Sequence, residues 1–156
     1  MAGFNGRSIL APLALLGVFL AGCSGGNDRE AELRETLNAM ETAMESRDIS
    51  EFMDHVSDEY KDSQNRVATD IRRVAQIHAL GNRNMHILSS IGQLSVNEDF
   101  AEAVVFVAVA AQPIDSPESL ANMRAELLRF RVEFEYHDQW LVSAAEWKGA
   151  RLNDFN

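Results

Sequence analysis

The chain has 156 residues, with 24 acidic and 14 basic side chains and a formal net charge of −10 at pH 7. Such an acidic surface disfavours nucleic acid as a partner, because phosphate backbones attract basic proteins. Cys23 is the single cysteine, so the chain cannot form an internal disulfide and must gain its stability from an apolar core.

The first 22 residues have the pattern of an export leader. Arg7 precedes an apolar run over residues 9–20, which is too short for a membrane-spanning helix of about 20 residues. Small residues then close the run in the sequence Leu20-Ala21-Gly22-Cys23. An ordinary cleaved signal peptide and a short uncleaved anchor are the alternatives that this pattern leaves open.

The ending Leu20-Ala21-Gly22-Cys23 resembles the lipobox of bacterial lipoproteins. That resemblance implies removal of residues 1–22 and acylation of Cys23, and two or more acyl chains hold a protein stably at a membrane. We therefore expect a lipid-anchored protein of the cell envelope, with Ser24 favouring the periplasmic face of the outer membrane if the host is Gram-negative. Residues 23–29 would be the lipidated cysteine and a flexible polar tether.

Three helices are predicted after the tether. Over residues 30–47 an apolar stripe recurs at helical spacing (Leu33, Leu37, Met40, Met44), with charged residues on the other face. Asp48, followed by Glu51 three residues later, resembles a capping box that begins a shorter second helix. A third helix is expected over residues 66–80, ended by Gly81 and Asn82.

Four strands follow, over residues 84–96, 100–111, 124–136 and 140–147. The second strand is apolar on both faces, which indicates that both faces are covered. The third alternates cleanly between apolar and charged residues, and residues 137–139 form a hairpin turn to the fourth. We expect one α+β domain over residues 30–148, with its helices on one face of an antiparallel sheet, and a loose C-terminal tail over residues 149–156.

The domain resembles the nuclear transport factor 2-like (NTF2-like, or SnoaL-like) superfamily. The resemblance rests on the order of the elements and on three segments, which are Glu45-Ser46-Arg47-Asp48, residues 56–62 (Val-Ser-Asp-Glu-Tyr-Lys-Asp) and residues 132–140. It implies a cone, in which three N-terminal helices pack on a strongly bent antiparallel sheet, often around a pocket. Members include isomerases, dehydratases, hydrolases and subunits that only bind or assemble, so the fold alone does not assign an activity.

Enzymes of this superfamily carry Asp, His or Tyr inside the cone, which makes Tyr60, His78 and His86 the catalytic candidates. Each also has a structural interpretation, as a buried tyrosine with a bonded hydroxyl or a histidine at the edge of the core. None of the four histidines has the i, i+4 spacing of a helical metal site, so we expect neither a metal nor another cofactor.

The outward face of the predicted sheet carries an apolar strip beside charges of both signs, formed by Val104, Phe106, Ala108, Arg129 and Arg131. Such a face favours an interface with a second copy or an envelope protein, and coverage by residues 112–122 or by the tail is the alternative. The sequence predicts a non-catalytic module that binds a small apolar ligand or assembles with a protein partner. The alternative is a SnoaL-like enzyme of the isomerase or hydrolase type.

Overall fold

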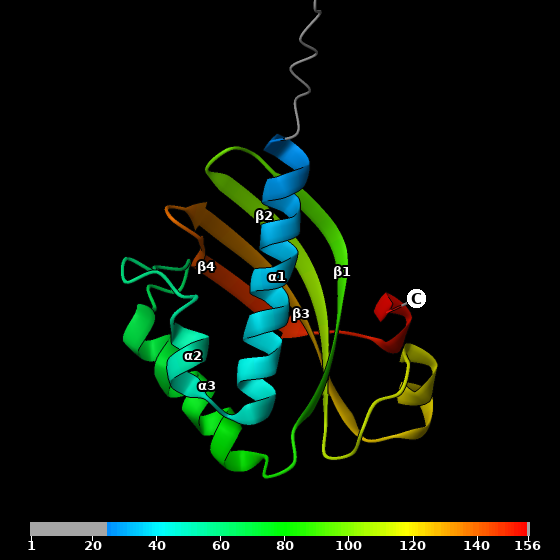
Figure 1. Ribbon diagram of the computed structural model, residues 1–156. Coiled ribbons are helices and arrows are strands. Elements are labelled where there is room, and N and C mark those ends of the chain that lie inside the picture. The colour runs from blue at the N-terminus through cyan, green and yellow to red at the C-terminus, as the bar shows by residue number, and fades with distance from the viewer. Residues whose placement is uncertain (1–24, 156) are drawn as a thin grey trace, which may run out of the picture.

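The computed structural model describes residues 25–155 (Figure 1). The predicted leader, Cys23 and Ser24 lie outside the described residues. Three α-helices come first, α1 (Gly25–Ser46), α2 (Ile49–Met53) and α3 (Ala68–Gly81). The remaining elements are β1 (His86–Val96), β2 (Phe100–Ala110), the 3₁₀ helix η1 (Pro117–Asn122), β3 (Ala125–Tyr136), β4 (Trp140–Gly149) and the 3₁₀ helix η2 (Leu152–Phe155). Within residues 25–155, no helix is both long and apolar enough to cross a membrane.

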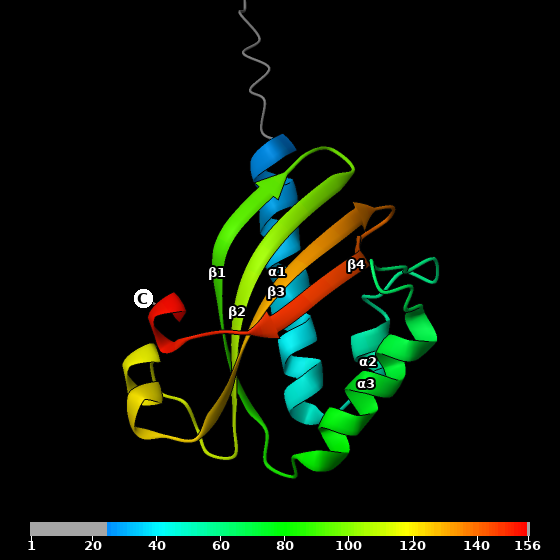
Figure 2. The same cartoon turned by 180° about the vertical axis from the view of Figure 1, so that it is seen from behind.

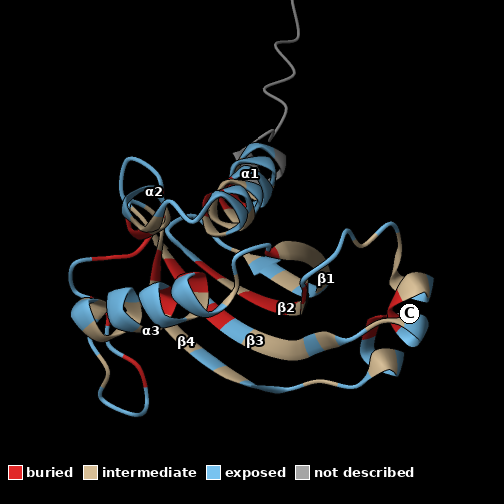
Figure 3. Ribbon diagram, turned by 90° about the horizontal axis from the view of Figure 1, so that it is seen from below, coloured by how far each residue is buried: buried red, intermediate tan, exposed pale blue. Residues whose placement is uncertain are grey.

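The four strands form one antiparallel sheet in the order β1-β2-β3-β4, and the three α-helices cover one of its faces (Figures 1 and 3). The pairing register shifts between Ile91 and Gln93 in β1, so Gly92 is an extra residue there, and it shifts again in β4 opposite Glu133 and Phe134. Such bulges bend a strand and increase its twist. The predicted α+β fold with helices on a bent antiparallel sheet is confirmed.

Local sequence determines where α2 and α3 begin. The Asp48 carboxylate accepts the Glu51 backbone N–H at 3.0 Å and caps α2, as its spacing predicts. The Asp70 carboxylate accepts the Val67 N–H at 3.1 Å at the start of α3. Asn65 has a φ of 59°, in the left-handed region that asparagine tolerates better than most residues, and this lets the chain turn sharply before α3.

The main core lies between the helices and the concave face of the sheet. Leu33 of α1, Tyr60 of the α2–α3 loop, and Phe134 and Trp140 of the sheet are its largest fully buried side chains. These residues come from distant parts of the chain, and they pack with the buried side chains Met53, Val56, Ala101, Ala103, Val105, Val132 and Val142.

A second apolar cluster shows that the C-terminal segment is not loose, contrary to the prediction. Phe155 is 6% exposed and packs with Ala108 and Leu120, while its ring centroid lies 5.9 Å from that of Phe106. Figure 2 shows η1 and η2 side by side at one end of the sheet, on the side away from α1. Packing of Phe155, together with the partly buried Ala150 and Leu152, therefore holds the C-terminal segment against the fold.

The start of α1 also differs from the predicted flexible tether over residues 23–29, because α1 already begins at Gly25. The Trp140 indole N–H donates to the Arg29 carbonyl at 3.0 Å, and the Arg29 guanidinium lies 3.3 Å from the centre of the Tyr136 ring. These long-range contacts fix the first turns of α1 against β3 and β4. Both apolar clusters that the structure describes lie within residues 33–155, so a fragment of residues 25–156 contains every side chain of the two clusters.

Candidate functional site: an apolar cavity between the helices and the sheet

The interior of the cone is hollow. A cavity of about 260 Å³, partly open to solvent, lies between α1, α3 and the concave face of the sheet. Its sheet wall is apolar apart from Ser89, and Met40, Met44 and Met85 give it an adaptable lining. The aliphatic and aromatic side chains that bound it are Leu37, Phe52, Val56, Ile71, Val74, Ala75, Ile87, Ile91, Val105, Val107, Val109, Leu128, Phe130, Val132, Phe134, Val142, Ala145 and Trp147.

Few polar side chains reach this cavity, and Glu41 of α1 carries the one carboxylate among its lining residues. The Ser89 hydroxyl of β1 donates a hydrogen bond to that carboxylate. Partial burial raises the pKa of Glu41, the Ser89 bond opposes this shift, and the like charge of Glu45 adds to it. The cavity therefore combines a large apolar surface with one hydrogen-bonded acid.

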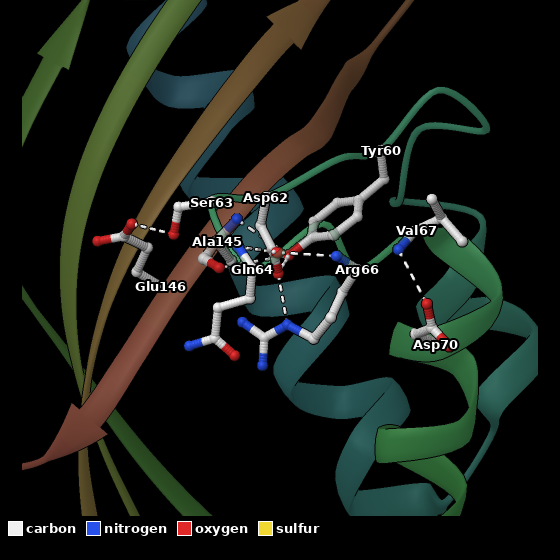
Figure 4. A network of polar contacts seen from close by, with 9 residues as sticks. All are labelled: Tyr60, Asp62, Ser63, Gln64, Arg66, Val67, Asp70, Ala145 and Glu146. Carbon is white, nitrogen blue, oxygen red and sulfur yellow. Dashed lines mark hydrogen bonds and ion pairs between the residues drawn. The ribbon is translucent and has the colours of Figure 1, made fainter.

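A buried polar network closes another part of the wall, where the α2–α3 loop meets β4 (Figure 4). The Tyr60 hydroxyl accepts the Ala145 backbone N–H at 3.1 Å and lies 3.1 Å from Oδ2 of Asp62, to which it donates. Burial raises the pKa of Tyr60, and the hydrogen bond to Asp62 raises it further. The tyrosine is therefore held in its neutral form.

Asp62 is the centre of that network. Its side chain is inaccessible to solvent and accepts the backbone N–H groups of Gln64 and Arg66 at 2.9 and 3.0 Å, together with Nε of Arg66 at 2.6 Å. Burial alone would raise the pKa of Asp62, but these hydrogen bonds outweigh it and lower the pKa below its ordinary value. The Arg66 guanidinium in turn lies 3.7 Å from the centre of the Trp147 ring, which lines the cavity.

Many solved structures share this architecture, but those named below are at most 18% identical to this chain in sequence. A candidate dehydratase of the NTF2-like family from Streptomyces avermitilis superimposes with a TM-score of 0.62 at 12% identity, over 80% of this chain and 99% of that protein. An NTF2-like protein of unknown function from Pseudomonas putida KT2440 gives a TM-score of 0.57 at 18% identity, over 78% of this chain and 87% of that one. The domain has the NTF2-like fold.

Bd1075 from Bdellovibrio bacteriovorus also matches the NTF2-like domain, with a TM-score of 0.62 at 10% identity over 83% of this chain. The chain spans 45% of that protein's length, so the match concerns one part of it. No protein-family model matches the sequence, and the search of curated proteins returns no match. At these identities the likeness establishes the fold and carries no activity with it.

The structure brings two of the three predicted catalytic candidates to one cavity. Tyr60 and His78 both line the NTF2-like cavity, whereas His86, at the start of β1, is not among its lining residues. The Tyr60 hydroxyl bonds Asp62 and Ala145, the environment that its structural interpretation describes. Among residues 25–155, no cluster of three or more His, Cys, Asp or Glu side chains is placed to hold a metal ion.

The predicted outward strip divides into two parts. Phe106 and Ala108 pack under Leu120 and Phe155. For these two residues the structure therefore shows coverage by the chain's own segments, which is the alternative that the sequence left open. Val104 is buried on the same face, beside Arg129 and Arg131. Arg131 forms a two-pronged ion pair with Glu102 at 2.8 and 3.0 Å on the exposed surface.

Sequence reasoning missed Glu41, because the helical pattern assigned it to the charged outer face of α1. The missed signal was on β1, where Ser89 interrupts a row of alternating apolar residues (Ile87, Ile91) that faces the cavity. A polar residue at an inward position requires a hydrogen-bonding partner. The pattern alone could not identify that partner, since the two residues are 48 positions apart.

Proposed function

We propose that this protein is an envelope lipoprotein, acylated at Cys23, whose NTF2-like domain binds a small apolar ligand in its cavity without catalysing a reaction. The cavity carries the ligand part of the proposal. It has a volume of about 260 Å³ and is bounded by apolar side chains, so an apolar molecule that leaves water to fill it lowers the free energy of the system. The anchor rests on the sequence Leu20-Ala21-Gly22-Cys23, which lies outside the described residues.

The size of the cavity limits the ligand. An apolar cavity of about 150 Å³ can hold benzene, and drug-sized ligands occupy about 300–1,000 Å³. A volume of about 260 Å³ therefore suits a molecule of roughly ten non-hydrogen atoms. The three lining methionines can adjust to ligands of different shape, because their side chains are flexible and polarisable.

Binding is better supported than catalysis. A general acid or base needs a proton that can move to or from the reacting atom, and a pKa near the working pH. The Tyr60 hydroxyl is instead bonded on both sides within the protein, to Ala145 and Asp62, and its pKa is raised. Of the two candidates that line the cavity, Tyr60 therefore serves the fold.

Binding is also better supported than assembly. The apolar strip that the sequence offered as an interface with a second copy or an envelope partner is covered at Phe106 and Ala108 by η1 and η2. The part of that strip left open to a partner is the charged surface around Arg129 and Arg131. The cavity, by contrast, is an apolar surface that the chain leaves unfilled.

Calorimetric titration of 1-octanol into residues 25–156 tests the ligand part. We expect saturable one-to-one binding, which Ala75→Leu weakens at least about tenfold, because the longer side chain fills part of the cavity and each 1.4 kcal/mol of lost contact is tenfold. Gln76→Leu is the matched control, since Gln76 is exposed and does not line the cavity. Equal binding by both variants, or no saturable binding by the unsubstituted domain, would contradict the proposal.

A further inference from the structure

The polar part of the cavity indicates which class of ligand it takes. We propose that the ligand is a small amphipathic amine, whose apolar body fills the cavity and whose protonated amino group pairs with the Glu41 carboxylate. This inference rests on the proposed function, because it assumes that the cavity is a binding site.

Glu41 is placed to receive a cation from inside the cavity. It lines the cavity together with Ser89, whose hydroxyl donates to one of its oxygens, Oε2. A carboxylate accepts several hydrogen bonds through its two oxygens, so the Ser89 bond orients the group and leaves acceptor capacity for a ligand. The residue is only partly buried, which keeps the carboxylate within reach of solvent and of an entering molecule.

The charges around Glu41 also favour a cation. Glu45, one turn further along α1, accepts the Ile87 N–H at 2.7 Å and holds a second negative charge at the same junction of α1 and β1. No ion pair among residues 25–155 supplies a basic partner to either glutamate. His78 of α3 is the one basic side chain among the cavity's lining residues.

The alternatives fit less well. A fatty acid would bring its carboxylate against Glu41 and Glu45, and like charges repel strongly in a partly desolvated site. A neutral alcohol could donate one hydrogen bond to Glu41, whereas an ammonium group has three donors and adds the attraction of opposite charges. The net charge of −10 further attracts cations over anions to the protein.

Three probes of nearly equal size separate these possibilities, namely octylamine, 1-octanol and octanoate, each titrated calorimetrically into residues 25–156. We expect octylamine to bind at least about tenfold more tightly than 1-octanol, and octanoate to bind most weakly. Glu41→Gln keeps the shape of the side chain and removes its charge, so it should abolish the preference for the amine, while 1-octanol, which can donate a hydrogen bond to either side chain, still binds saturably. Retained 1-octanol binding also shows that the variant is folded.

Glu45→Gln is the matched control, since it removes one negative charge from the same helix but does not change a lining residue. It should lower octylamine affinity by less than about threefold, because its charge acts at longer range and is screened by salt. Saturable 1-octanol binding without a preference for octylamine, or a preference that survives Glu41→Gln, overturns this inference and leaves the proposed function standing. Failure of all three probes to bind overturns both.

Discussion

The Tyr60 hydroxyl lies 3.1 Å from Oδ2 of Asp62, and both side chains are buried in the loop that joins α2 to α3. Through this contact the loop is tied to β4, because the same hydroxyl accepts the Ala145 N–H. The pair thus fixes the loop that carries Arg66 over Trp147 on the cavity wall. A fixed position for Trp147 on β4 matters to a binding site whose one lining carboxylate, Glu41, is on α1.

Removing Asp62 should destabilise the fold more than removing the hydroxyl of Tyr60. Asp62→Ala leaves the Tyr60 hydroxyl and the Arg66 guanidinium without their partner, and breaking a buried ion pair in this way costs about 3–5 kcal/mol. Tyr60→Phe leaves only the Ala145 N–H unpaired, at a cost of about 1–3 kcal/mol. Urea unfolding measures both, and equal losses would contradict the central position of Asp62.

The same carboxylate makes stability depend on pH. The pKa of Asp62 is lowered in the folded state from an ordinary value of 3.8, so the unfolded chain binds more protons between the two values. The contribution of Asp62 is therefore complete above the ordinary value and is lost as the pH falls through the folded value. Asp62→Asn has no such titration, so the difference in unfolding free energy between the two proteins should shrink on acidification. A constant difference down to about pH 2 would refute this assignment.

Replacement of Gly92 and of Gly81 by alanine should change the stability of the fold in opposite directions. A Cβ at Gly92 would lie 2.6 Å from the Phe106 ring, which is held against Phe155, whereas a Cβ at Gly81 meets nothing within 4 Å. Gly92→Ala should cost about 1–3 kcal/mol by overpacking. Gly81→Ala, at the end of α3, should stabilise the protein by about 0.4–1 kcal/mol. Thermal unfolding checks both, and a neutral Gly92→Ala would show that the ring moves aside freely.

The sequence predicts most of the fold because helix and strand periodicity is local. The third helix, expected over residues 66–80, is found at Ala68–Gly81, and the expected strand over residues 124–136 is found at Ala125–Tyr136. Both have an apolar pattern that repeats over three or more turns or pleats. The capping of α2 by Asp48 is equally local, since it spans three residues.

The features that the sequence did not predict depend on contacts between distant residues. The start of α1 is ordered because Arg29 meets Tyr136 and Trp140, which are more than 100 positions away. Phe155 is held by Phe106 and Ala108 in the same way. The cavity follows from the sum of many side-chain volumes, and no single residue type signals whether such an interior is filled or hollow.

Acylation of Cys23 has a direct chemical signature. Intact-mass spectrometry of the protein extracted from its native membrane should give a chain that begins at Cys23 and carries at least two acyl groups. Cys23→Ala removes the acceptor sulfur, so the variant should lack the acyl mass and keep the leader. A native chain with an unmodified Cys23, or with the leader still attached, would contradict the proposed anchor.

Methyl NMR of the methionines tests the binding cavity most directly. Met40, Met44 and Met85 line it, whereas Met53 belongs to the packed core and Met123 to the cluster beside η1. On titration of octylamine into residues 25–156, we expect the first three methyl resonances to shift in a saturable manner while those of Met53 and Met123 stay in place. Equal shifts at all five, or none at the three lining residues, would contradict a ligand-binding cavity.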